Sequence, residues 1–187
     1  MRNKENGTQR VSDRDNSKGR ALVLPGLKAH LIFWSLAAIC LTLDLWSKRA
    51  VFDWLRQKPG NSFSIIDGFL QLVMAENSGA AFGIAAGQRH LLIAVSGLAL
   101  IAIFVIFFLS QTEQILSHIA LGLFVAGVCG NLYDRIFNDG LVRDFIDIVY
   151  WPGRHWPAFN MADSMLCAGV GLMIVSSFFH REDFSKT

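Results

Sequence analysis

The stretch LLIAVSGLALIAIFVIFFL, residues 91–109, contains no charged side chain and decides the class of fold. Its length is close to the ~20 residues that an α-helix needs to cross a bilayer. Three further segments of similar length are nearly as apolar and carry only isolated polar residues. Inside hydrocarbon the backbone must satisfy its own hydrogen bonds, and the alternation of a membrane barrel is missing. We therefore predict four membrane-spanning helices, at about residues 29–48, 89–109, 115–137 and 158–180.

The composition of the whole chain agrees with a membrane protein. Of its 187 residues, 52% are hydrophobic and 17% are charged, whereas an average soluble domain carries about 25% charged residues. The formal net charge of +2 provides no basic field for nucleic acid. Cys40, Cys129 and Cys167 lie inside apolar runs without the spacing of a zinc site, so we interpret them as packing residues. We expect no metal, no cofactor and no nucleic-acid partner.

Residues 1–26 form a polar segment with six lysines and arginines. Such a segment cannot bury enough apolar surface to offset its ordering entropy, so we predict a flexible tail before a single membrane domain at 27–187. An even number of helices places both termini on one side, and the tail with Lys28 brings seven positive charges there. The positive-inside rule therefore favours cytoplasmic termini, although further basic residues lie near the far end of the first helix.

The connection between the first two helices is expected to form a small sheet. Short apolar or alternating runs lie at 51–54, 63–66 and 69–75. Turn residues separate them, which is a pattern typical of strands in hairpins. We predict a β-cradle at about residues 50–86, outside the bilayer and on its surface. A turn at 138–140 ends the third helix, and the aromatic linker that follows is typical of a membrane interface.

Several aspartates lie where the predicted helices end. An ionised group at the centre of a spanning segment costs at least ~2.5–3.5 kcal/mol, so acids in such segments indicate function by default. A four-helix topology brings four segments to one membrane face: the end of the first helix, the end of the third helix, the loop that follows it and the start of the fourth helix. The predicted cluster consists of Asp44, Asp134, Asp144, Asp147 and Asp163.

Neighbours in the sequence separate structural acids from functional ones. Asp44 and Lys48 are four residues apart on one helix face, which predicts an ion pair. Asp134 adjoins Arg135, and a carboxylate beside a guanidinium is a poor proton donor, so we interpret Asp134 as a structural anchor. Asp163 has no basic neighbour in the sequence, which favours a functional role.

A pair of carboxyl groups held close together in a poorly solvated site shares one proton, so that one group accepts a proton from water while the other donates. Such a pair is sufficient to hydrolyse an amide without a metal ion. The sequence contains no HExxH, GxSxG or Ser-x-x-Lys motif, and its five histidines show no ligand spacing. A proton-coupled transporter would place its acids near mid-bilayer and show internal repeats. A non-catalytic membrane scaffold is the third alternative.

Five short motifs give a more specific indication. They are DLWSK at 44–48, NSGAAFG at 77–83, GNLYDR at 130–135, VRDFID at 142–147 and FNMADS at 159–164. In order and spacing they resemble the motif set of signal peptidase II, the lipoprotein signal peptidase family, over roughly residues 30–180. The resemblance implies a mainly α-helical membrane fold of four transmembrane helices, with a small periplasmic β-sheet cradle between the first two.

The resemblance also implies roles for individual residues. The catalytic carboxyl groups of an aspartic endopeptidase would be Asp144 and Asp163. Residues that support this pair or hold the substrate backbone would be Asn77, Asn131, Arg135 and Asn160, and residues tied to structure would be Asp44, Lys48 and Asp134. Arg143 stands where the family commonly has valine, and we expect its guanidinium to face lipid phosphates or water.

By the same resemblance, the substrate would be a prolipoprotein whose cysteine already carries a diacylglyceryl group, cut on the amino side of that cysteine. The enzyme would be a monomer among the lipids of the bacterial inner membrane, with its active site at the outer face. Gly79, Ala80 and Ala81 would either let an extended substrate backbone approach or form a tight turn in the sheet.

Overall fold

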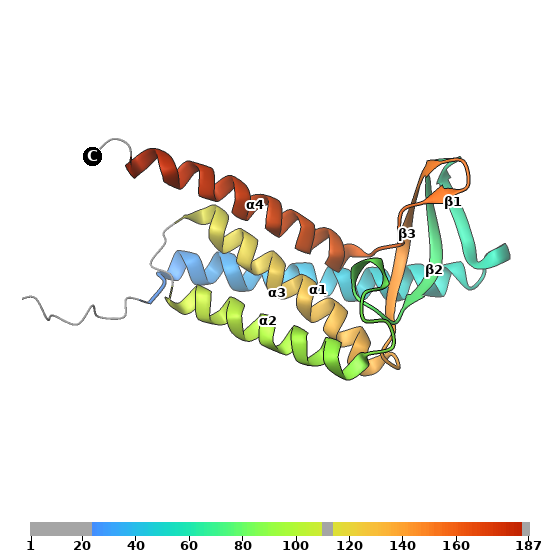
Figure 1. The fold of residues 1–187 in the computed structure, drawn as a ribbon, viewed down its shortest axis with the longest axis horizontal. Helices are drawn as coiled ribbons and strands as arrows, with labels where there is room; N and C mark the ends of the chain where they lie inside the picture. Colours follow the sequence, from blue (N-terminus) through green and yellow to red (C-terminus); the bar gives the residue numbers. More distant parts are fainter. Residues whose placement is uncertain (1–23, 110–113, 185–187) are drawn as a thin grey trace, which may run out of the picture.

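The computed structural model describes residues 24–109 and 114–184, so the predicted tail, residues 1–26, lies outside the described residues except for 24–26. Within these ranges the chain forms four long helices, α1 (Leu27–Leu55), α2 (Arg89–Leu109), α3 (Ile115–Phe137) and α4 (Met161–Phe184). They run along the long axis of the molecule, and the described chain begins and ends at the same end of the bundle (Figure 1). The sheet lies at the opposite end.

α3 is the central helix of the bundle. Half of the most apolar 18-residue stretch of α3 is buried inside the protein, whereas 17% to 22% of the corresponding stretch is buried in each of the other three helices. The outer sides are apolar and exposed, for example at Leu98 and Ile101 of α2. Exposed apolar surface on this scale is stable against lipid rather than water. In the described residues, four helices are long and apolar enough to cross a membrane, and the predicted multi-pass membrane fold is confirmed.

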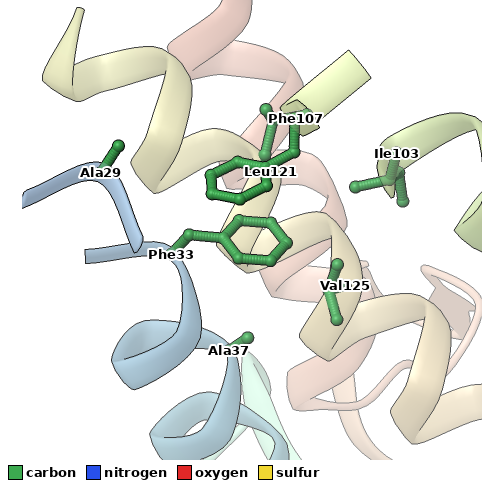
Figure 2. Close-up of a cluster of buried hydrophobic side chains, with 7 residues drawn as sticks. All are labelled: Ala29, Phe33, Ala37, Ile103, Phe107, Leu121 and Val125. Carbon is green, nitrogen blue, oxygen red and sulfur yellow. The ribbon is translucent and has the colours of Figure 1, made fainter. Parts of the chain in front are cut away.

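A core of aromatic and aliphatic side chains joins α1, α2 and α3 (Figure 2). Phe33 of α1 and Phe107 of α2 stack with their ring centroids 4.0 Å apart, and Leu121 of α3 packs against them. Two glycines let α3 approach its neighbours closely. A Cβ at Gly122 would lie 3.1 Å from the Phe33 carbonyl oxygen, and a Cβ at Gly130 would collide with a carboxylate of α1. The small residues of α3 therefore make room for the polar groups described below.

An antiparallel sheet of four strands, in the order β1-β2-β3-β4, covers the other end of the described bundle (Figure 1). Its strands are β1 (Ser62–Ile66), β2 (Leu70–Asn77), β3 (Val142–Trp151) and β4 (Arg154–His155). Gly68, at φ +72°, lies in the turn between β1 and β2, where a left-handed backbone favours glycine. Ala75 pairs with Asp144 across β2 and β3. The predicted class, four helices with a small sheet, is confirmed.

Two local assignments differ from the sequence prediction. Residues 51–54, predicted as a strand, belong to α1, because Phe52 and Leu55 are buried on the same helix face as Lys48 at the i, i+4, i+7 spacing. Residues 142–151, expected to form an interfacial linker, form β3, because β2 supplies a pairing partner that no local pattern reveals. Part of the sheet therefore follows α3 instead of lying between α1 and α2.

Candidate active site

A buried ion cluster ties α1 to α3 and α4. Lys48 Nζ lies 2.8 Å from Asp44 Oδ2 and 3.5 Å from Asp134 Oδ2, and these three side chains are 0% exposed. Lys48 also donates to Asn131 Oδ1 at 3.0 Å. The backbone N–H of Ala162 donates to Asp44 Oδ1 at 2.8 Å, so the start of α4 is fixed to α1. The predicted Asp44–Lys48 ion pair is confirmed.

Asp134 binds Arg143 instead of the neighbouring Arg135. The backbone N–H of Arg143 donates to Asp134 Oδ2 at 3.0 Å, and its guanidinium donates to Asp134 Oδ1, with Nε at 3.1 Å. The expectation that the Arg143 guanidinium faces lipid phosphates or water is therefore wrong, and only an edge of the side chain, 20% of its surface, is exposed. A buried carboxylate requires a counter-charge, and β3 passes close enough to provide it.

Arg135 points to a different side of α3, because successive residues of a helix are about 100° apart. Its Nη2 donates to the Gly79 carbonyl oxygen at 2.9 Å. The Gly79 N–H in turn donates to Asn77 Oδ1 at 2.8 Å. The buried Nε of Arg135 has no hydrogen-bond partner among the described residues. Arg135 thus anchors the loop after β2.

Asn160 and Asp163 cap the start of α4 and position each other. Asn160 Oδ1 accepts the backbone N–H of Asp163 at 3.0 Å, and Asp163 Oδ2 accepts the backbone N–H of Asn160 at 3.1 Å. This reciprocal arrangement is a capping box. Asn131 Nδ2 donates to the second oxygen, Asp163 Oδ1, at 2.8 Å. Both oxygens of Asp163 are therefore held in place at the positive end of the helix dipole.

Asp144, on β3, receives hydrogen bonds from two side-chain amides. Asn160 Nδ2 donates to Asp144 Oδ1 at 2.7 Å, and Asn77 Nδ2 donates to Asp144 Oδ2 at 3.2 Å. Asn160 is completely buried and bonds to both Asp144 and Asp163. One asparagine therefore joins a carboxyl group from a strand to a carboxyl group from a helix.

The electrostatic environment favours the protonated form of Asp144. Burial is the largest cause and the negative charge of Asp163 the second, and together they raise the pKa of Asp144 to about 7. The hydrogen bonds from Asn77 and Asn160 act in the opposite direction and only reduce this effect. Near neutral pH, Asp144 can therefore carry a proton.

Asp147 belongs to a separate group on the sheet. It lies three residues after Asp144, so the two side chains point to opposite faces of β3. Asp147 Oδ2 is 2.8 Å from His155 Nδ1 and accepts a hydrogen bond from Gln71 Nε2 at 2.5 Å. The sequence predicts Asp147 in the cluster of acids, and no motif indicates Gln71 or His155 as its partners. The strand register, in which Gln71 pairs with Asp147, is what brings them together.

With the exception of Asp147, the structure brings together the residues that the motifs selected, in one region between the bundle and the sheet. Lys48, Asn131 and Asn160 form a continuous chain of hydrogen bonds from the ion cluster to the pair of Asp144 and Asp163. The fold and this region define a multi-pass membrane protein in which buried carboxyl groups from distant parts of the chain meet at the sheet end of the bundle.

Comparison with known proteins assigns the family. The family model described as signal peptidase (SPase) II matches residues 36–179, and the chain belongs to this family. It is therefore a membrane peptidase, which confirms the family and the class of enzyme expected from the five motifs.

Individual relatives agree with this assignment. The lipoprotein signal peptidase of Rhodopirellula baltica is 39% identical over 165 residues, covering 80% of this chain and 72% of the relative. That of Geobacter metallireducens is 37% identical over 160 residues, covering 84% and 96%. A bacterial membrane enzyme solved by the in meso method is similar in structure, with a TM-score of 0.71 and 31% identity over 83% of this chain and 90% of that one.

Proposed function

We propose that this peptidase removes the signal peptide from diacylglyceryl-modified prolipoproteins, and that Asp144 and Asp163 activate the water molecule. The curated relatives are named lipoprotein signal peptidases, which supports the substrate class. The observation that carries the mechanism is the hydrogen bonding of Asn160 to both carboxyl groups, at 2.7 Å and 3.1 Å. Aspartic peptidases use two carboxyl groups that share one site, and bonding of both groups to the same asparagine supports such a pair.

The proposed reaction starts with a proton on Asp144 and an ionised Asp163. Water attacks the carbonyl carbon of the scissile bond and gives a proton to Asp163, while Asp144 gives its proton to the carbonyl oxygen. When the tetrahedral intermediate collapses, Asp163 protonates the leaving nitrogen and a hydroxyl proton returns to Asp144. The pKa of Asp144, raised to about 7, suits a group that must be protonated at the start of each cycle.

Neighbouring groups are suited to binding the substrate backbone. The positive charge of Arg135 acts on both Asp144 and Asp163, so its guanidinium is suited to stabilising the oxyanion of the intermediate. Gly79 lies so close to the following loop that a Cβ would be 2.9 Å from the Ile84 carbonyl oxygen. The loop held by Arg135 and Asn77 can therefore form a wall of an extended-peptide site.

The location of the pair beside the sheet fits a lipid-bearing substrate. The sheet and the described chain ends lie at opposite ends of the bundle (Figure 1). With the basic tail and both termini in the cytoplasm, the pair would face the outer side of the bacterial inner membrane. A substrate anchored by its diacylglyceryl group would then reach the site by lateral diffusion, and the proposed cut is on the amino side of the modified cysteine.

The test is to incubate the purified protein, in detergent micelles, with a synthetic precursor that carries the diacylglyceryl cysteine. Mass measurement of the product should show that its new amino terminus is the lipidated cysteine. Asp144→Asn and Asp163→Asn should each abolish cleavage, while Asp147→Asn, which alters a carboxyl group on the same strand, should cleave normally. Efficient cleavage by either dyad variant, or equal cleavage of an unlipidated precursor, would refute the proposal.

A further inference from the structure

The sheet end of the bundle carries a second feature, on the side of α1 and α3, that the peptidase mechanism does not use. It is a cavity of about 530 Å³, a size in the range of about 300–1,000 Å³ that is usual for small-molecule sites. Three guanidinium groups and one carboxylate line it, from Arg49, Arg56, Arg143 and Asp53. None of the groups that hydrogen-bond Asp144 or Asp163 through their side chains lines this cavity.

An apolar groove of about 220 Å³ continues from this cavity along the bundle. The two share Leu45 of α1 and Tyr133 of α3. The groove is lined by apolar side chains of both helices, including Leu41, Leu132 and Ile136. A charged compartment and an apolar compartment are thus joined end to end on the face between α1 and α3.

The order of the residues along α1 matches the order of groups in a phospholipid. With a rise of 1.5 Å per residue, Arg49 lies about 6 Å and Arg56 about 16 Å further along the helix axis than Leu45, in the direction of the sheet. Trp46, which lines the cavity and is 67% exposed, is the residue type that membrane–water interfaces favour. The apolar groove therefore lies at the depth of acyl chains, and the arginines lie at the depth of headgroups.

The charged compartment has an excess of positive charge. Asp53 is shared between Arg56, at 2.7 Å, and Arg49, at 3.9 Å, and all three side chains are more than half exposed. Exposed ion pairs of this kind are weak, so a phosphate can compete for both arginines. Asp134 holds the Arg143 guanidinium in a fixed position at the wall of the cavity.

We propose that this face binds an anionic phospholipid, with its headgroup between Arg49 and Arg56 and an acyl chain in the groove beside Leu45. The site borders the peptidase centre, because the carbonyl oxygen of Arg143 accepts a hydrogen bond from Asn160 Nδ2 at 3.3 Å. The bound lipid is distinct from the substrate, since the diacylglyceryl group carries no phosphate. This inference does not depend on the proposed cleavage reaction.

The test titrates phosphatidylglycerol or phosphatidylcholine of the same chain length into the detergent-solubilised full chain, and measures the bound fraction by native mass spectrometry. Phosphatidylglycerol should bind more tightly. The double variant Arg49→Gln/Arg56→Gln should weaken that binding by about fivefold or more for each arginine removed, and Arg154→Gln, an exposed arginine of β4, should not change it. High salt should weaken the wild-type binding towards that of the double variant.

Two results would overturn the proposal. One is equal affinity for the two lipids, which would mean that only the apolar groove selects the ligand. The other is unchanged phosphatidylglycerol binding by the double variant, with circular dichroism showing that it is folded. The substituted side chains, Arg49 and Arg56, are exposed. The double variant therefore leaves the Arg143–Asp134 ion pair unchanged.

Discussion

Asn160→Ser separates two functions of one side chain. Serine is a good N-cap residue, so the start of α4 should be retained. The substitution removes the Nδ2 donor, which lies 2.7 Å from Asp144 Oδ1. It therefore changes the proton affinity of one carboxyl group while the helix that positions the other carboxyl group stays in place.

The size of the effect follows from this hydrogen bond. A hydrogen bond to a charged group contributes about 1.5–3 kcal/mol, and one pKa unit corresponds to about 1.4 kcal/mol. The bond from Asn160 favours the ionised form and lowers the pKa of Asp144. Its loss should therefore raise the pKa of Asp144, which is about 7 in the wild type, by about one to two pH units. If protonated Asp144 is the acid, the alkaline limb of kcat/KM should move to higher pH by the same amount.

The assay is a profile of kcat/KM against pH, from about pH 5 to pH 10, with the lipidated precursor in micelles. The Asp147→Asn variant is the control, because Asp147 contacts Gln71 and His155 and not the pair. Its alkaline limb should coincide with that of the wild type. Loss of activity at every pH with an unmoved alkaline limb would contradict this prediction, since the Asn160 side chain would then be purely structural.

Three further predictions concern stability. Asp144→Asn should raise Tm at pH 8, because the pKa of this carboxyl group rises from 3.8 to about 7 on folding. Such a group destabilises the folded protein increasingly as the pH rises between those two values, by on the order of 4 kcal/mol at most. The gain in Tm should vanish below about pH 4, which a series of thermal-shift measurements would show. Gly130→Ala should lower Tm, because its Cβ would collide with the Asp44 carboxylate, whereas Gly97→Ala, with no atom within 4 Å, should not; equal Tm values would contradict the packing argument. Asp134→Asn should reduce yield, while protein that folds keeps its specific activity.

The helices could be predicted from sequence because the bilayer imposes a local rule. A run of apolar residues must span hydrocarbon as a helix whatever its neighbours are, and residues 91–109 satisfy this rule alone. The sheet depends on a partner from elsewhere in the chain. Nothing local to residues 142–151 indicates that β2 will pair with them, so the sequence predicts a linker there.

The residue types of the candidate site could be predicted from the sequence, but their contacts could not. Motif order identified Asp144, Asp163 and Asn160, yet the sequence assigned Asp134 to its neighbour Arg135. The observed partner, Arg143, is nine residues away and comes close only when β3 folds back over α3. Distance in the sequence predicts which side chains pair within one helix, as it does for Asp44 and Lys48. It does not predict the pairs that form where a strand meets a helix.

The central claim is that Asp144 and Asp163 act as one unit on one water molecule. The most direct test is to measure single-turnover cleavage of the lipidated precursor by Asp144→Asn, Asp163→Asn and the double variant. Groups that act as a unit are non-additive, so all three proteins should show the same residual rate. A single variant that cleaves at a substantial rate, with a further loss in the double variant, would contradict the claim.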